Sequence, residues 1–295
     1  MSIQEKLKGT GVAIVTPFNK DSNIDFLSLE RLLKHLLSNG VNYLVALGTT
    51  GEAATLNKDE KQALLNFVID YVDGRVPIVA GFGGNNTNEI SNSIQQYDFK
   101  GIDAILSVAP YYNKPSQEGL YYHYKEIATI SPVPVILYNV PGRTSVNINA
   151  STVLKLAADF DNIVAVKEAS GNFEQIMQII KGKPKDFMVI SGDDLLTLPL
   201  ISLGVHGVIS VVANAFPKQF SNLVNLSLEG NFNEAMKIQN QLMDFINLLF
   251  SDGNPAGIKA ALDILNICPN NFRLPLSPVS HTTYNKLKEQ INTIN

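Results

Sequence analysis

Short apolar runs recur along the chain at intervals of roughly 25 to 35 residues, and amphipathic segments separate them. Such short runs are typical of buried strands, whereas apolar residues three and four positions apart are typical of helices. Repeated alternation of the two predicts strand–helix units around a parallel sheet. The predicted strands are residues 12–15, 43–47, 78–80, 104–108, 135–138, 163–166, 188–190 and 208–211.

Eight strand–helix units predict a closed (β/α)8 barrel, the TIM-barrel fold of the α/β class. Asp25 and Asn57, whose side chains are suited to capping, precede two of the helical segments. After the eighth run the pattern is helical without further strands, which predicts a C-terminal helical extension. We therefore expect a barrel domain of residues 1–230 and a helical domain of residues 231–295. The predicted helices include residues 26–38, 58–72, 89–97, 119–130, 173–180, 219–231, 232–250 and 254–265.

The composition is that of a globular protein with a small negative charge. With 295 residues, 45% of them hydrophobic, the chain is long enough to bury a large core. A net charge of -4 disfavours nucleic acid. The most apolar stretch, residues 198–216, is interrupted by proline, glycine, histidine and asparagine, which disfavours a membrane span. The first residues lack the apolar core of a secretory signal and Cys268 is the single cysteine, so we expect a cytoplasmic protein. The histidines are scattered without ligand spacing, and we expect no metal or other cofactor.

Polar residues follow five of the apolar runs. In a (β/α)8 barrel the strand ends and the loops after them meet at one face, where active sites lie. We therefore expect these residues to converge on one site. They are residues 48–52, 110–113, 138–143, Lys167 and residues 191–194.

Lys167 closes the sixth run and precedes a loop that contains Gly171. At the rim of a barrel, desolvation disfavours the charged form of a lysine and favours the neutral amine, which attacks carbonyl groups. Lys167 is therefore a candidate nucleophile that forms a Schiff base. The alternative is a structural lysine that lays its stem on apolar neighbours and keeps its ammonium in water.

A Schiff base requires a proton carrier, because its formation and tautomerisation each move a proton. Tyr138 ends the neighbouring strand and is a candidate carrier that passes protons to Thr49 and onward to Tyr112. The alternative for Tyr138 is a buried tyrosine that donates to a carbonyl group.

Two segments are candidate anion sites. The turn of residues 48–52 presents backbone N–H groups and the hydroxyls of Thr49 and Thr50, which suits a small carboxylate; the alternative is a turn shaped by glycine for conformation alone. The planar guanidinium of Arg143 is suited to binding a second carboxylate. The alternative is that Arg143 forms a surface ion pair. Asp193 and Asp194 are interpreted as caps of the following helix, and acidic residues such as Glu168 as groups that orient loops.

Three separated segments, residues 48–52, 138–143 and 166–169, resemble those of the dihydrodipicolinate synthases. These enzymes belong to the pyruvate-dependent aldolase family that includes N-acetylneuraminate lyase. The resemblance extends from about Gly9 to Pro278 and includes the segments after the fourth, seventh and eighth strands.

The resemblance implies that Lys167 forms a Schiff base with pyruvate and that Tyr138, Thr49 and Tyr112 relay protons. It also implies condensation with L-aspartate 4-semialdehyde to 4-hydroxy-tetrahydrodipicolinate, in the diaminopimelate route to lysine. In similar enzymes the residue at Tyr112 reaches into the neighbouring subunit of a tight dimer, and two such dimers form a homotetramer. The implied substrate-binding residues are Thr50, Arg143, Gly192 and Ile209.

Two alternatives remain from the sequence. One is a sister aldolase, such as N-acetylneuraminate lyase or a keto-deoxy sugar acid aldolase, which uses the same lysine and tyrosine. Arg143 favours the semialdehyde, because that substrate carries its own carboxylate. The other is a barrel that binds ligands without catalysis.

The resemblance also implies a lysine-binding site at the tight-dimer interface. Lys61 departs from the pattern of lysine-sensitive members, which tend to carry histidine or an acid there. A cation near the ammonium of the ligand repels it by about 1 kcal/mol or more at contact distance. We therefore expect weak or absent inhibition by lysine. The residues concerned are Ala53, Lys58, Lys61, Asn85, Glu89 and Tyr111.

Overall fold

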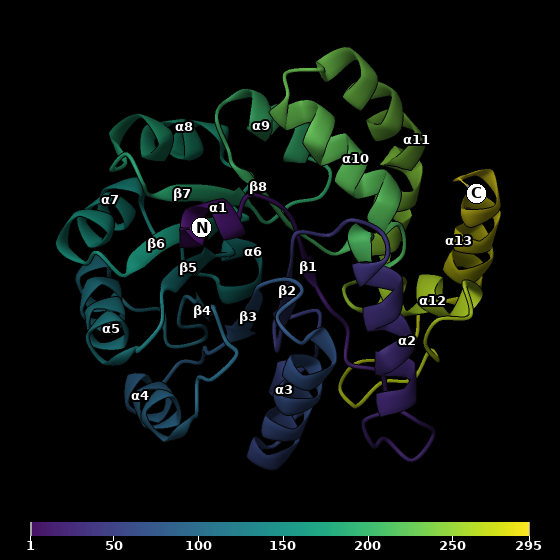
Figure 1. Ribbon diagram of the computed structural model, residues 1–295, viewed down its shortest axis with the longest axis horizontal. Coiled ribbons are helices and arrows are strands. Elements are labelled where there is room, and N and C mark those ends of the chain that lie inside the picture. Colours follow the sequence, from purple (N-terminus) through teal and green to yellow (C-terminus); the bar gives the residue numbers. More distant parts are fainter. Residues whose placement is uncertain (1, 295) are drawn as a thin grey trace.

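Eight parallel strands form a closed barrel in the computed structural model, which describes residues 2–294 (Figure 1). Each strand pairs with the next along the chain, and β1 closes the barrel against β8 with Gly9 opposite Gly207. The predicted (β/α)8 barrel is confirmed. The strands are β1 (Gly9–Ala13), β2 (Tyr43–Ala46), β3 (Ile78–Gly81), β4 (Ala104–Val108), β5 (Val135–Asn139), β6 (Ile163–Glu168), β7 (Met188–Ser191) and β8 (Gly207–Ser210).

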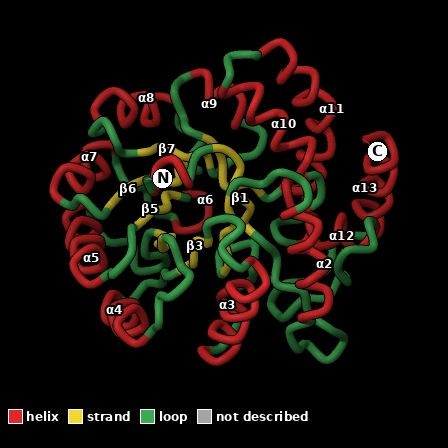
Figure 2. Tube along the Cα trace, viewed as in Figure 1, coloured by secondary structure: helices red, strands yellow, loops and turns green. Residues whose placement is uncertain are grey.

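Helices connect the strands and form a ring outside the barrel (Figure 2). The predicted caps are present: the Asp25 side chain accepts from the N–H of Ser28 at 3.0 Å, and that of Asn57 accepts from the N–H of Glu60 at 2.9 Å. The helices are α1 (Ile3–Lys6), α2 (Phe26–Leu37), α3 (Lys58–Val72), α4 (Thr87–Gln96), α5 (Gln117–Ile130), α6 (Pro141–Thr144), α7 (Ala150–Asp159), α8 (Phe173–Gly182), α9 (Thr197–Ser202), α10 (Pro217–Leu228), α11 (Phe232–Ser251), α12 (Ala256–Ile264) and α13 (His281–Ile294), with 3-10 turns η1 (Ala53–Thr55) and η2 (Val212–Asn214).

The first strand begins three residues before the predicted start at residue 12. Glycine is normally disfavoured inside strands, which hides this start from the sequence pattern. In the structure a Cβ atom at Gly11 would lie 2.2 Å from the ring of Tyr43. The ring fills the barrel interior beside β1, so only glycine fits there.

The barrel interior is packed with apolar side chains, among them Tyr43, Met188 and Ile209. Leu7, which follows α1, is fully buried in this same cluster. Helix α1 therefore covers the amino end of the barrel (Figure 1).

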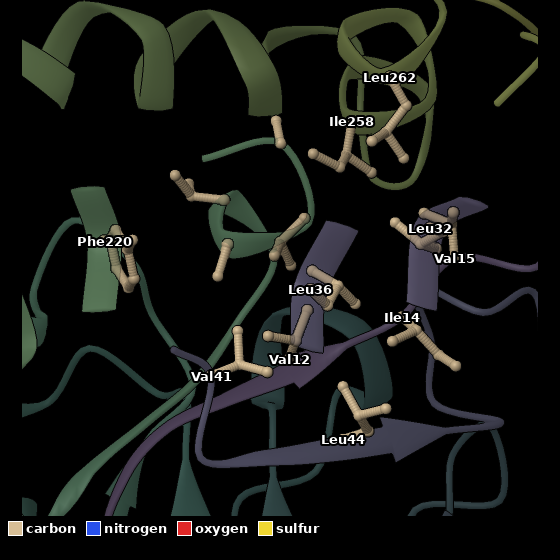
Figure 3. Close-up of a cluster of buried hydrophobic side chains, with 14 of the residues drawn as sticks. Val12, Ile14, Val15, Leu32, Leu36, Val41, Leu44, Phe220, Ile258 and Leu262 are labelled. Atoms are coloured by element: carbon tan, nitrogen blue, oxygen red, sulfur yellow. The ribbon is translucent and has the colours of Figure 1, made fainter. Parts of the chain in front are cut away.

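The C-terminal helices share a core with the barrel. Ile258 and Leu262 of α12 belong to the same buried cluster as Val12 of β1, Leu44 of β2 and Leu36 of α2 (Figure 3). Helices α11, α12 and α13 lie together outside α10 and α2 (Figure 1). The predicted domain boundary after residue 230 falls between α10 and α11 and stays a prediction. Within residues 2–294, no helix has the length and apolar character that crossing a membrane requires.

Candidate active site

A cavity of about 130 Å³ opens at the carboxyl end of the barrel. This volume is below the roughly 300 Å³ at which pockets for drug-sized ligands begin, so the cavity suits a small molecule. Apolar residues from β1, β2 and β4, namely Ala13, Val45 and Leu106, line its floor. Gly192 also lines the cavity. The polar side chains around the cavity are those of Thr49, Thr50, Tyr138, Arg143, Lys167, Asp193 and Asn254.

Lys167 lies at the centre of these residues. It is opposite Tyr138 in the pairing of β5 with β6, and its Nζ atom lies 4.3 Å from the centroid of the Tyr138 ring. Lys167 is 6% exposed, and none of the ion pairs among residues 2–294 includes it. A Cβ atom at Gly192 would lie 3.0 Å from Lys167 Cε, so the glycine leaves room for the lysine stem. The amine is thus held beside a phenol and has no carboxylate partner among the ion pairs of the described residues.

The turn after β2 brings two hydroxyls to the cavity. Thr49 is exposed and Thr50 is buried, and both line the cavity. The turn is bounded by Leu47 and Glu52, whose φ angles of 58° and 52° lie in the left-handed region. The hydroxyls and backbone of this turn form a candidate site for a carboxylate.

Arg143 borders the cavity from the short helix α6, which begins at Pro141. Its side chain is exposed, and the ion pairs formed by residues 2–294 do not include it. A guanidinium without an internal carboxylate partner is available to a bound anion.

Glu168 ties the loops around Lys167 together, as predicted for it. The side chain is 1% exposed and accepts from Asn139 Nδ2 at 3.0 Å, Gln175 Nε2 at 3.1 Å and the N–H of Ser170 at 2.8 Å. Asn139 in turn accepts from the N–H of Ile148 at 2.9 Å. One carboxylate therefore links the ends of β5 and β6 to the segment that follows Arg143 and to α8.

The two aspartates after β7 have different roles. Asp193 Oδ1 accepts from the N–H groups of Leu195 and Leu196 at 3.0 and 3.1 Å and so closes the turn before α9. The prediction that Asp193 caps α9 is wrong, because this turn separates it from the helix, whose N-cap is Leu196 without a side-chain capping bond. The same prediction for Asp194 is also wrong. Its Oδ2 accepts from the N–H groups of Val211 and Val212 at 3.0 and 3.3 Å, because the turn after β8 leaves these donors without backbone partners. Burial raises the pKa of Asp194 from 3.8 to about 6.

The buried carboxyl of Asp194 predicts a pH dependence of stability. Since its pKa is higher in the folded chain, the folded protein holds the extra proton between pH 4 and 6, and the free energy of unfolding falls as pH rises through this window. From pH 4.5 to 7 the wild type is expected to lose about 2 kcal/mol that Asp194→Asn does not lose. Urea unfolding of both proteins at the two pH values measures this difference. Parallel changes in the two proteins would contradict it.

Two residues implied by the family resemblance do not line the cavity. Tyr112 is 88% exposed, with a φ of 73°, on the loop after β4. Ile209 is buried in the barrel interior within β8. A single chain thus brings Thr49, Tyr138 and Lys167 together but leaves Tyr112 at the surface.

Phe250 and Asn254 line the cavity and were missed from the sequence. They come from the end of α11 and the loop after it, more than 80 residues from Lys167 along the chain. No motif marks them. The one available signal is the interruption of the helical pattern by Gly253, Asn254 and Pro255.

The predicted lysine-binding residues lie on η1, α3, the loops after β3 and β4, and α4. Two of these loops are tied together, since Asn113 Nδ2 donates to the carbonyl oxygen of Asn85 at 2.8 Å. Lys61 is half-buried, and burial lowers its pKa. Lys58 is exposed and donates to Gln96 Oε1 at 2.7 Å.

A second cavity, of about 650 Å³, lies at the amino ends of β2, β3 and β4. Two of its charged groups pair with each other: Lys6 Nζ lies 2.8 Å from Asp103 Oδ1, and Asp103 Oδ2 accepts from the N–H of Ile78 at 2.9 Å. The amino face of a (β/α)8 barrel contributes to stability rather than to chemistry. The cavity near Lys167 is therefore the candidate active site.

Comparisons with known proteins show the family of the chain. The model of the dihydrodipicolinate synthetase family matches residues 6–294. The curated 4-hydroxy-tetrahydrodipicolinate synthase of Phocaeicola vulgatus is 50% identical, with 99% of this chain and 98% of that protein covered. The synthase of Parabacteroides distasonis is 51% identical, with 98% and 97% covered.

Solved structures of the same family are also similar to this chain. A chloride-inhibited dihydrodipicolinate synthase from Acinetobacter baumannii, complexed with pyruvate, superposes with a TM-score of 0.94 at 39% identity. The match covers 98% of this chain and 99% of that one. Sequence and fold agree over nearly the whole length, and the chain belongs to the dihydrodipicolinate synthetase family.

Proposed function

We propose that the protein condenses pyruvate with L-aspartate 4-semialdehyde and releases 4-hydroxy-tetrahydrodipicolinate, at the entry to the diaminopimelate route to lysine. The observation that carries the proposal is the buried amine of Lys167 beside the ring of Tyr138, in a small cavity lined by hydroxyls and a guanidinium. The names of the curated relatives and the pyruvate complex of the Acinetobacter enzyme support it.

The chemistry begins at Lys167. Its neutral amine attacks the ketone carbon of pyruvate, and loss of water from the adduct gives an imine. Loss of a methyl proton gives an enamine, whose carbon attacks the aldehyde of the semialdehyde and forms the new C–C bond. The amino group of the second substrate then attacks the imine carbon, which closes the ring and releases Lys167 as the free amine.

Each of these steps moves a proton, and Tyr138 is the nearest carrier. Its ring lies beside the Lys167 amine, and Thr49 borders the same cavity. We infer that Tyr138 takes and returns protons at the carbinolamine and enamine steps and exchanges them through Thr49. Thr50 and the backbone of its turn bind the pyruvate carboxylate. Gly192 leaves room for the stem of Lys167 beside the imine.

We infer that a second copy of the chain supplies Tyr112 to this relay. The support is the 88% exposure of Tyr112 beside Tyr111, which is 42% exposed, so that the two rings present an apolar surface on one loop. An aromatic side chain with this exposure is suited to an interface between copies. The active assembly we propose is a tight dimer, two of which form a homotetramer.

Arg143 is proposed to bind the carboxylate of the semialdehyde. Arg143→Ala is expected to raise the KM for the semialdehyde by about tenfold to a hundredfold, because a charge-assisted pair contributes roughly 1.5–3 kcal/mol. Imine formation with pyruvate should change little, since the carboxylate of pyruvate is proposed to bind the turn of residues 48–52, called the threonine turn below. Steady-state kinetics with each substrate varied, together with the rate of borohydride trapping, separates the two effects. Equal losses for both substrates would contradict the role.

Lys61 predicts a weak response to lysine. A cation at this position repels the ammonium of the ligand by about 1 kcal/mol, or about fivefold in affinity. Lys61→His is therefore expected to strengthen inhibition by about fivefold or more. Initial rates over a lysine titration measure this for both proteins, with Lys34→His on α2 as a control for added histidine. Micromolar inhibition of the wild type would contradict the prediction.

Borohydride reduction in the presence of pyruvate tests the proposed covalent step. The expected result is one reduced pyruvate adduct per chain, located at Lys167 by peptide mass mapping. No adduct, or an adduct confined to exposed lysines, would contradict the proposed function and favour a ligand-binding barrel.

A further inference from the structure

The C-terminal segment makes polar contacts with the threonine turn. Asn254 Nδ2 donates to Thr50 Oγ1 at 3.0 Å. Five residues further on, Lys259 of α12 forms an ion pair with Glu52, the last residue of the turn. The barrel loop that borders the active site is thus held from outside the barrel.

The ion pair is entirely inaccessible to water: both side chains are 0% exposed. Lys259 Nζ also donates to the carbonyl oxygen of Asn271 at 2.9 Å and lies 4.4 Å from the centroid of the Phe18 ring. Burial lowers the pKa of Lys259, and the carboxylate of Glu52 opposes this effect. The cost of desolvating two ions largely offsets their attraction, so a buried pair of this kind adds little net stability. The pair instead fixes the position of Glu52 at the end of the turn.

The turn requires such fixing, because its backbone is unfavourable by itself. Left-handed φ angles at Leu47 and Glu52 each cost roughly 1–2 kcal/mol for residues with a side chain. Other contacts hold its remaining parts: Thr16 Oγ1 donates to the carbonyl oxygen of Gly51 at 2.6 Å. Thr49 and Thr50 lie between the anchored ends and face the cavity.

We propose that Asn254 and Lys259 are positioning residues, which hold the threonine turn in the geometry that binds the carboxylate of pyruvate. The C-terminal helices are then part of the active site, in addition to their packing against the barrel. The inference rests on the proposed function, in which Thr50 and its turn bind that carboxylate.

Asn254→Asp tests the contact with Thr50 at nearly unchanged volume. A carboxylate at this position cannot donate to Thr50 Oγ1 and instead accepts a hydrogen bond from the Thr50 hydroxyl, and its charge repels the carboxylate of pyruvate. The KM for pyruvate is expected to rise about tenfold or more, while kcat and the KM for the semialdehyde change by less than about threefold. The pyruvate concentration that half-saturates borohydride trapping should rise in parallel.

The double variant Glu52→Gln/Lys259→Met tests the ion pair without leaving one charge buried and unpaired. It is expected to give the same selective rise in the KM for pyruvate. Tyr284→Phe serves as the matched control, because it removes a 2.7 Å hydrogen bond to Asp263 within the C-terminal helices, outside the turn. Its KM values should equal those of the wild type.

An unchanged pyruvate KM in Asn254→Asp and in the double variant would overturn the inference. Equal losses for both substrates would also overturn it, since they indicate general damage to the fold. Failure of the proposed function is distinguishable, because the wild type would then fail to consume the semialdehyde. Trapping with pyruvate would still report the half-saturation of each variant.

Discussion

Lys167→Ala is expected to lower kcat by about four orders of magnitude or more, because it removes the group that we propose forms the covalent intermediate. Among the described residues that line the cavity, Lys167 is the one lysine, and its amine lies 4.3 Å from the centroid of the Tyr138 ring. Borohydride trapping with pyruvate should yield no adduct. Single-turnover kinetics and intact-protein mass spectrometry measure the two losses.

The fold of this variant should persist, because alanine removes a side chain from the edge of a cavity rather than from the packed interior. Lys155→Ala is a matched control: Lys155 Nζ also lies over a tyrosine ring, 4.2 Å from the centroid of Tyr121, but at the surface. It should retain full activity. Residual turnover within tenfold of the wild type in Lys167→Ala would show that the covalent step uses another group.

Tyr138→Phe is expected to lower kcat by about two to four orders of magnitude, the usual contribution of a general acid–base group. The ring stays and keeps its contact with Lys167, so pyruvate binding should be nearly unchanged. The formation of the imine should become rate-limiting. Its rate is measured by stopping the reaction with borohydride at increasing times after mixing with pyruvate.

Tyr43→Phe is the matched control for Tyr138→Phe. Tyr43 is also a tyrosine of the barrel interior, and its hydroxyl donates to the carbonyl oxygen of Val208 at 3.3 Å, away from the cavity. Loss of this hydroxyl should lower stability by about 1 kcal/mol and leave the imine rate unchanged. If both variants slowed the reaction equally, the loss would come from packing rather than from proton transfer.

The barrel could be predicted from the sequence because its strands are buried on both faces. The run 163–166 is apolar throughout and is followed directly by Lys167, and Ser107 is the one polar residue of the run 104–108. The proximity of Lys167 and Tyr138 could be predicted as well, since the strand ends of a parallel barrel converge. Their adjacency in the β5–β6 pairing follows from the order of the strands.

Other features depend on contacts between distant segments, which leave no periodic signal. Position 11 of β1 requires glycine because the ring of Tyr43 occupies the adjacent space. Asp194 turns toward N–H groups 17 and 18 residues away instead of capping the next helix. Asn254 reaches Thr50 across 204 residues of chain. Each of these requires the folded arrangement, which the local pattern does not contain.

The proposed synthase activity is tested by measuring pyruvate consumption by the purified protein. The measurement is made separately with L-aspartate 4-semialdehyde, N-acetylmannosamine and glyceraldehyde. The predicted result is rapid consumption with the semialdehyde alone, because it carries the carboxylate that Arg143 is placed to bind. Rapid consumption with one of the sugar aldehydes and none with the semialdehyde would contradict the proposed synthase and identify a sister aldolase built on the same lysine.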